Sequence, residues 1–121
     1  MKLEINTKGN YEIIDITDKV NENIKEGKIA NIFVTGTTAS LRIIEYEEGH
    51  VNDLKRFFKD LDKKEYLHDD NGHAHLLGAI FGQSLTIPVE NGKLNLGRWQ
   101  RVVLIDFDNR ARKREVILEV M

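Results

Sequence analysis

The grouping of its strand-like segments constrains the fold of this chain more than any other feature of the sequence. Short segments rich in β-branched or alternating apolar residues come in groups of two, two and four, and segments with helical apolar spacing separate these groups. The predicted order is two strands, a helix, two strands, two helices and four strands. Because the helices stand between groups of strands and do not alternate with single strands, the order favours an α+β fold over a doubly wound sheet.

Eight segments have the strand pattern: Leu3–Thr7, Tyr11–Ile16, Ile29–Thr35, Leu41–Tyr46, Ser84–Val89, Lys93–Leu96, Arg98–Phe107 and Ala111–Val120. Gly9-Asn10 predicts a hairpin between the first two segments. The last four are expected to form a β-meander, with hairpin turns at Asn91-Gly92 and Asp108-Asn109. Pro88 favours an edge strand or a bulge, because proline cannot donate a hydrogen bond to a neighbouring strand.

Three segments have the helical pattern. The first is a short helix with Thr17 as its N-cap and Gly27 as its stop. The second, Val51–Leu61, is amphipathic, and its apolar face is expected to cover a sheet. The third, Ala74–Phe81, is apolar almost all round, as expected of a buried helix, and Asn71 is its predicted N-cap.

Length and charge limit the class of protein. A chain of 121 residues matches one domain, here residues 1–121. With 18 basic and 20 acidic side chains, the chain is not expected to bind nucleic acid through bulk charge. No secretory signal pattern is visible at the start, and no apolar run approaches the ~20 residues of a membrane-spanning helix, so we expect a soluble, cytoplasmic protein without a membrane partner. The absence of cysteine excludes thiolate metal sites and thiol nucleophiles.

Three of the four histidines lie within eight residues, at His68, His73 and His75. Within a helix, His73 and His75 would point about 200° apart. We therefore expect His75 to join His68 across the loop, while His73 either completes a three-nitrogen metal site or faces solvent. Three protein ligands suffice for a catalytic zinc. The alternative is that these histidines only cap and hydrogen-bond the loop.

Other candidates lie outside the histidine stretch. Glu45 follows two isoleucines in an apolar strand context, where a carboxylate is costly unless it is paired or functional, so it is a candidate base or ligand. Arg98, Trp99, Gln100 and Arg101 bring the only tryptophan together with two arginines. This group can stack on a flat ligand and bind an anion, although Trp99 can equally fill a core or a subunit interface.

Two polar segments have weaker signals. The Thr35–Ser40 loop is rich in hydroxyls and can hold a phosphate through backbone N–H groups and the side chains of Thr37 and Thr38. It lacks the lysine and the glycine spacing of a P-loop. The basic run Arg110–Arg114 is interpreted as a solvated strand edge.

Several stretches recur together as an ordered set: Gly36-Thr37-Thr38-Ala39, Glu45, Asp53-Leu54, His68-Asp69, Asn71, Ala74-His75-Leu76, Gly82–Val89, Gly92-Lys93-Leu94 and Leu96–Gln100. In this order, and over nearly the full length, the chain resembles the YjbQ-like family, also known as the secondary thiamine-phosphate synthase family. The resemblance implies an α+β domain with a β-sandwich-like core of mostly antiparallel strands and two or three helices. It also implies a homotrimer with a cluster of histidines and acids near a subunit boundary.

The resemblance implies a function as well. It predicts an enzyme acting on a small phosphorylated ligand, similar to a thiamine-phosphate synthase, which joins a pyrimidine diphosphate to a thiazole phosphate and releases pyrophosphate. A divalent metal, zinc or magnesium, would be held by the three clustered histidines. The expected catalytic residues are Glu45, His68 and His75, and the expected ligand-binding residues are Thr37, Thr38, Asn71, Arg98, Trp99 and Gln100.

The sequence departs from the family pattern at two positions. Gly36 stands where the family has the histidine of His-Thr-Thr-Ala, and Ile44 stands where it has an asparagine before the acid. Loss of one imidazole weakens metal binding unless His73 or water replaces it. The alternative function is therefore a catalytically weak, trimeric small-molecule or phosphate-binding protein.

Overall fold

A computed structural model describes residues 1–62, 65–68 and 70–121, so that Asp69 of the histidine stretch lies outside it. Within these ranges, strands and helices follow one another in the predicted order. They are β1 (Lys2–Thr7), β2 (Glu12–Asp15), α1 (Thr17–Asn21), β3 (Ile29–Val34), β4 (Ala39–Ile44), α2 (Glu48–Leu61), α3 (Gly72–Phe81), β5 (Ser84–Glu90), β6 (Lys93–Leu94), β7 (Arg101–Asp106) and β8 (Arg112–Val120). The fold is α+β, as predicted.

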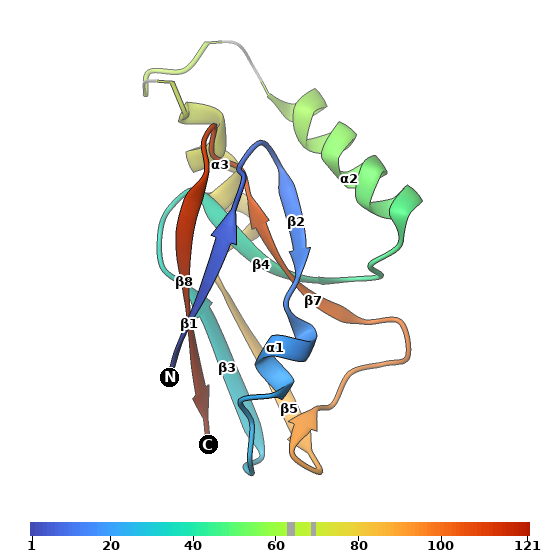
Figure 1. Cartoon of the computed structure of the whole chain (residues 1–121). Coiled ribbons are helices and arrows are strands. Elements are labelled where there is room, and N and C mark those ends of the chain that lie inside the picture. Colours follow the sequence, from blue (N-terminus) through green and yellow to red (C-terminus); the bar gives the residue numbers. More distant parts are fainter. Residues whose placement is uncertain (63–64, 69) are drawn as a thin grey trace.

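The strands form two antiparallel sheets (Figure 1). One has the order β1-β8-β3-β5-β6 and the other the order β2-β7-β4. The predicted hairpin at the start is wrong, because β1 pairs with β8 in the first sheet and β2 pairs with β7 in the second. The intervening turn has positive φ at Gly9, Asn10 and Tyr11, and it carries the chain from one sheet to the other.

The predicted β-meander is also wrong, because β7 and β8 belong to different sheets. Only β5 and β6 pair as a hairpin, and Asn91 and Gly92, both with positive φ, form its turn as predicted. The carbonyl of Pro88 accepts a hydrogen bond from Asn95, so its nitrogen also faces away from β3. On that side β6 pairs with only Val89 and Glu90 of β5, so the strand pairing ends beside Pro88 and does not require the N–H group that proline lacks.

Two hydrophobic cores lie on opposite faces of the three-stranded sheet. Between the sheets, Val102 and Leu104 of β7 pack with residues of β1, β3, β8 and α1. On the other face, Val103 and Ile105 pack under α2 and α3. The continuous burial of β7 follows from this arrangement, since both faces of the strand are covered.

Aromatic residues fill the second core. Phe58 of the amphipathic α2 is 2% exposed and lies with its ring centroid 5.1 Å from that of Phe107, edge to face. Tyr11 and Phe81 pack around the same pair. The prediction that α2 covers a sheet with its apolar face is confirmed for Phe58, with Val51 and Leu54 partly buried beside it, but Phe57 and Leu61 are exposed.

Helix α3 approaches the loop after β3 closely. A Cβ atom at Gly78 would lie 2.4 Å from the carbonyl oxygen of Thr37, so only glycine permits this contact. The helix begins at Gly72, earlier than the predicted Ala74, and ends at Phe81 as predicted; Asn71 holds the N-cap position, but its side chain makes no capping hydrogen bond. The first helix is shorter than predicted: Thr17 is its first residue, not its N-cap, because the Thr17 hydroxyl accepts a hydrogen bond from Val102 N.

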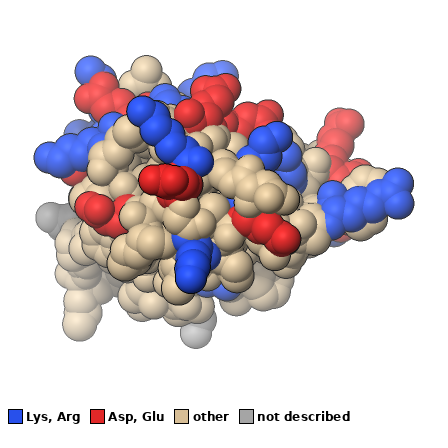
Figure 2. Space-filling view, turned by 90° about the horizontal axis from the view of Figure 1, so that it is seen from below, with Lys and Arg blue, Asp and Glu red and all other residues tan. Residues whose placement is uncertain are grey.

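The surface at one end of the molecule carries both signs of charge. In Figure 2, basic and acidic side chains are intermixed over this face. Figure 1 places both chain termini at this end, next to β1 and β8. In the part of the chain that the structure describes, no helix is long and apolar enough to cross a membrane.

Candidate functional site

His68 and His75 form a pair at the start of α3. Their ring centroids lie 4.2 Å apart, as expected from the sequence for this pair. His68 stands on the exposed loop and His75 in the first turns of the helix. Together with Tyr66, Leu67, Gly72 and Leu76, they line an open cavity of about 330 Å³.

His73 does not join this pair. Its Nε2 atom lies 3.1 Å from the carbonyl oxygen of Phe107, and its ring packs 5.9 Å from that of Tyr11. His73 therefore does not complete a three-nitrogen site with this pair; its half-buried ring also lines a separate open cavity with Leu76 and Ile80. The reason is the early start of α3 at Gly72, which turns His73 and His75 to different sides of the helix.

The donor set does not fit the expected metal. Among the described residues, no group of three or more histidine, aspartate or glutamate side chains is placed to hold a metal ion. The His68–His75 pair is one protein ligand short of an ordinary catalytic zinc site.

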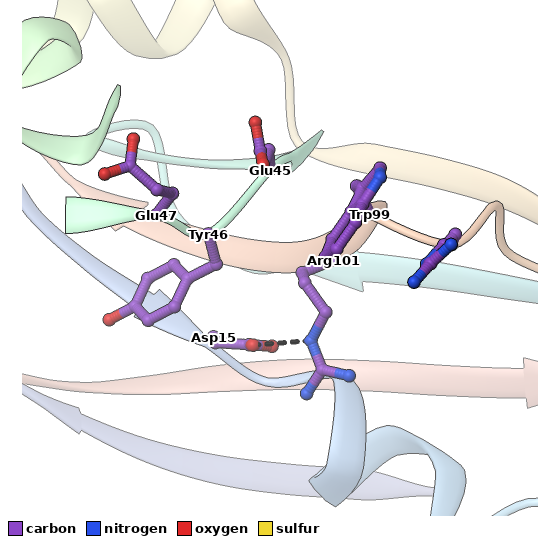
Figure 3. A pocket seen from close by; sticks show the side chains of 7 residues that line it. Asp15, Glu45, Tyr46, Glu47, Trp99 and Arg101 are labelled. Carbon is purple, nitrogen blue, oxygen red and sulfur yellow. Dashed lines mark hydrogen bonds and ion pairs between the residues drawn. The ribbon is translucent and has the colours of Figure 1, made fainter. Parts of the chain in front are cut away.

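A second cavity, of about 390 Å³, lies at the C-terminal end of β4 (Figure 3). Its lining residues come from the ends of three strands and the turn before β7: Asp15, Glu45, Tyr46, Glu47, Arg98, Trp99 and Arg101. It shares no lining residue with the histidine cavity. A single chain therefore does not bring the predicted catalytic residues Glu45, His68 and His75 into one cavity.

Glu45 lies in this second cavity, but the argument that selected it is wrong. β4 ends at Ile44, so Glu45 is exposed and does not lie within an apolar strand. Its neighbour Glu47 has a structural task, because its carboxylate accepts hydrogen bonds from the backbone N–H groups of Gly49 and His50 and caps α2. These two bonds hold the pKa of Glu47 below its ordinary value. Among the acids that line this cavity, Glu45 is the one whose carboxylate makes no hydrogen bond or ion pair to a described residue.

The two arginines of the cavity differ in their free donors. Arg101 donates from Nε to Asp15 at 2.7 Å and from Nη2 to Asp18 at 3.1 Å, as Figure 3 shows for Asp15. Burial alone would raise the pKa of Asp15, but bonds from Thr17 and Arg101 hold it below its ordinary value. Arg98 has no such ion pair among the described residues; its guanidinium lies 4.9 Å from the ring centroid of Trp99.

Trp99 is the cavity's aromatic surface. Its side chain is 63% exposed and does not fill the core of this chain. Gln100 does not line the cavity; its Oε1 accepts a hydrogen bond from Gly97 N at 2.7 Å and closes the turn before β7. The predicted ligand-binding group is therefore reduced to Arg98 and Trp99, with Gln100 shaping the turn that carries them.

A buried charge network lies beneath the Thr35–Ser40 loop, and the sequence interpretation missed it. Asp106 accepts hydrogen bonds from Nε and Nη2 of Arg114 at 2.8 and 2.9 Å, and from the Thr7 hydroxyl. Burial alone would raise the pKa of Asp106, but these bonds hold it below its ordinary value. The interpretation of Arg114 as part of a solvated edge is wrong, since β8 lies between β1 and β3 and Arg114 is 7% exposed.

Three predicted ligand-binding residues border this network. The Thr38 hydroxyl donates to Asp108 at 3.0 Å and accepts from Arg114 Nη2 at 2.7 Å, so it is used within the protein. The Asn71 amide lies 3.5 Å from the other oxygen of Asp108. Thr37 is exposed, and its carbonyl faces α3. The signal for the network was Asp106, an acid in an unbroken apolar strand.

Comparison with known proteins gives consistent results. The family model described as "UPF0047 protein YjbQ-like" matches residues 1–121. A UPF0047 protein of Archaeoglobus fulgidus is 38% identical, with all of both chains aligned. The UPF0047 protein YugU of Bacillus subtilis is 33% identical over 98% of this chain and 96% of its own.

Solved structures share the fold. An uncharacterised conserved protein of the yjbq/upf0047 family from Clostridium acetobutylicum superposes with a TM-score of 0.90 and 28% identity, over 100% of this chain and 99% of that one. A protein of unknown function from Sulfolobus solfataricus superposes with a TM-score of 0.83 and 32% identity, over 99% and 95% of the two chains.

Proposed function

We propose that this chain, which belongs to the UPF0047 YjbQ-like family, binds a small molecule combining a flat ring with a phosphate group, in the cavity lined by Glu45 and Trp99. The observation that carries the proposal is the contact between Arg98 and Trp99. The Arg98 guanidinium, which forms no ion pair with a described residue, lies against the exposed ring of Trp99 within a cavity of about 390 Å³. A cavity of this size accommodates a small ligand.

Each group in the cavity has a separate part in binding. The free face of Trp99 can stack on the ring of the ligand. Arg98 can donate two parallel hydrogen bonds to phosphate oxygens, whereas the donors of Arg101 are already directed to Asp15 and Asp18. Glu45 stands exposed at the same cavity and can accept a proton.

The proposed reaction is a transfer of the thiamine-phosphate synthase type. The thiazole nitrogen would attack the methylene carbon of a pyrimidine diphosphate, the carbon–oxygen bond would break, and pyrophosphate would leave with the bonding electrons. Arg98 would stabilise the charge on the leaving pyrophosphate. Glu45 would orient the pyrimidine ring by accepting a hydrogen bond from it.

We propose further that the working unit is a homotrimer. The histidine cavity and the Trp99 cavity are separate in one chain, so His68 and His75 can reach the same ligand only if another copy supplies them. Leu67 and Leu76 line the histidine cavity as exposed apolar side chains, and exposed apolar surface of this kind is typical of an interface between subunits.

A second candidate function is binding without turnover. It is favoured by the donor set, because the described chain offers two paired imidazoles and no third ligand, and Gly36 supplies no imidazole. In this case the ligand is held by Arg98 and Trp99 and released unchanged.

Fluorescence and product formation separate these functions. Since Trp99 is the only tryptophan, its emission reports on this cavity alone. The protein is titrated with the pyrimidine diphosphate and the thiazole phosphate, and thiamine phosphate is measured chromatographically. The test variants are Arg98→Gln and Glu45→Gln. Arg56→Gln is the matched control, because Arg56 is an exposed arginine on α2, outside this cavity.

Each outcome has a definite meaning. Quenching that Arg98→Gln weakens at least tenfold, together with thiamine phosphate formation, supports the transferase. The same quenching without product supports the binding protein. If neither compound changes the emission, or if Arg98→Gln and Arg56→Gln behave alike, this cavity is not the ligand site.

A further inference from the structure

Arg114 carries a donor that the buried network does not use. Its Nε and Nη2 atoms donate to Asp106, and Nη2 also donates to Thr38. Within the described part of the chain, Nη1 has no hydrogen-bond partner, although the side chain as a whole is only 8% exposed. Arginine has five N–H groups in a fixed plane, so two of them point away from the Asp106 pair.

The free Nη1 atom faces the space beside Gly36. A Cβ atom built on Gly36 would lie 2.9 Å from Nη1, and no other atom outside the adjoining residues would come within 4 Å of it. The absence of a side chain at position 36 therefore leaves open space beside this edge of the guanidinium. Among the described residues, Ser40 Oγ is the one side-chain polar atom that is both fully buried and without a hydrogen-bond partner. Because Nη1 also has no partner, it is not fully buried, and solvent reaches it.

Backbone donors lie at the same place. Gly36 and Thr37 form a bend between β3 and β4, both are exposed, and their N–H groups make no hydrogen bond to any described residue. Successive free N–H groups in a turn form a common concave site for anions. A guanidinium held rigid by a buried carboxylate adds a charge-assisted donor to them.

We propose that the N–H groups of Gly36 and Thr37 and Nη1 of Arg114 together form a binding site for a phosphate group. The pair with Asp106 fixes the guanidinium plane before a ligand arrives, so little conformational entropy is lost on binding. Asp108 is the second carboxylate near this site, and its ion pair with Arg112 at 2.8 Å reduces the repulsion that its negative charge would exert on a bound phosphate. The site does not depend on the Trp99 cavity, with which it shares no residue.

The test is a titration of isotopically labelled protein with inorganic phosphate at constant ionic strength. The nuclear magnetic resonance signals of the Gly36 amide and of the Arg114 side chain are expected to shift and saturate together, whereas sodium chloride produces no saturable shift. The Trp99 indole signal serves as an independent report on the other cavity, so that failure of one site is distinguished from failure of the other.

Two glycine variants separate site blocking from backbone strain. Gly36→Ala places a methyl group 2.9 Å from Nη1 at a φ of +114°, and phosphate affinity is expected to fall at least tenfold. Gly82→Ala is the control, because its φ is also positive (+83°) but no atom lies within 4 Å of the new Cβ. The phosphate affinity of the Gly82→Ala variant is expected to equal that of the unmodified protein.

The proposal is overturned by any of three results. They are the absence of saturable shifts in the unmodified protein, equal shifts with phosphate and chloride, which would indicate an adventitious ion only, and unchanged affinity in Gly36→Ala. The first two concern the unmodified protein, so the proposal remains testable even if Gly36→Ala fails to fold.

Discussion

Replacement of Asp106 by asparagine is expected to destabilise the protein more than any exposed charge change. Asp106 is fully buried and accepts two hydrogen bonds from Arg114, one from Thr7 and one from the backbone N–H of Asp108. Asparagine keeps the shape but replaces one acceptor oxygen by an NH₂ group, which would face donors. It also leaves the Arg114 guanidinium charged, buried and without its counterion.

The magnitude follows from the burial of the pair. Removing one partner of a buried ion pair costs about 3–5 kcal/mol. The total free energy of unfolding of a domain is about 5–15 kcal/mol, so the variant loses roughly 30–50% of a mid-range value of about 10 kcal/mol. With a urea dependence of about 1.5 kcal/mol per molar, the unfolding midpoint is expected to fall by roughly 2–3 M.

The assay is urea unfolding followed by far-ultraviolet circular dichroism at one fixed protein concentration, because subunit association would otherwise shift the midpoint. Asp53→Asn is the matched control. Asp53 pairs with Arg56 at 2.9 Å, but both side chains are well exposed, so its loss is expected to cost under about 0.5 kcal/mol. A cost below about 1 kcal/mol for Asp106→Asn, or equal costs for the two variants, would refute the reasoning.

Three further predictions concern the packing around the candidate sites. Gly78→Ala places a Cβ atom 2.4 Å from the Thr37 carbonyl, so the melting temperature should fall, because the clash exceeds the gain in helix propensity of about 1 kcal/mol; an unchanged temperature would contradict the packing of α3 on this loop. Phe58→Ala removes the centre of the second core and is expected to cost about 3–5 kcal/mol in urea unfolding, against less than 1 kcal/mol if α2 contributed little. Burial and the nearby Asp62 carboxylate raise the pKa of Tyr11 to about 12, so the neutral phenol contributes stability that is complete below its ordinary pKa of 10.0 and is lost as the pH rises toward 12. Tyr11→Phe should remove this alkaline loss in a pH series of melting temperatures, and an identical loss in the variant would show that other groups cause it.

The order of the secondary structure could be predicted from sequence because local spacing decides it. In β1 the apolar residues alternate with polar ones, and in α2 they recur at helical spacing. These two spacings show in the sequence itself which residues share a face of the strand or helix. The strand pairing could not be predicted. The turn at Gly9-Asn10 resembles a hairpin turn in composition, yet the chain there crosses between sheets, and only the distant strands β7 and β8 determine this.

The candidate site was predictable where it depends on local features of the chain, and not where it depends on contacts between distant strands. The approach of His68 to His75 follows from a short loop and a helix start, both local features. The burial of Arg114 depends on Asp106, which joins it from another sheet, so the basic run around it appeared to be an exposed edge. Glu45 shows the opposite error: it was expected to lie within an apolar strand, but β4 ends at the half-buried Ile44, and Glu45, the next residue, is exposed.

The position of β8 between β1 and β3 also has a consequence for synthesis on the ribosome. Until β8 emerges, β1 has no neighbour in its sheet, and β3 is paired on one side only. Asp106 meanwhile has no guanidinium to neutralise it, because Arg114 arrives on β8. The nascent chain therefore cannot complete its larger sheet stepwise, and native folding must wait until β8 has left the exit tunnel and joined the strands made before it.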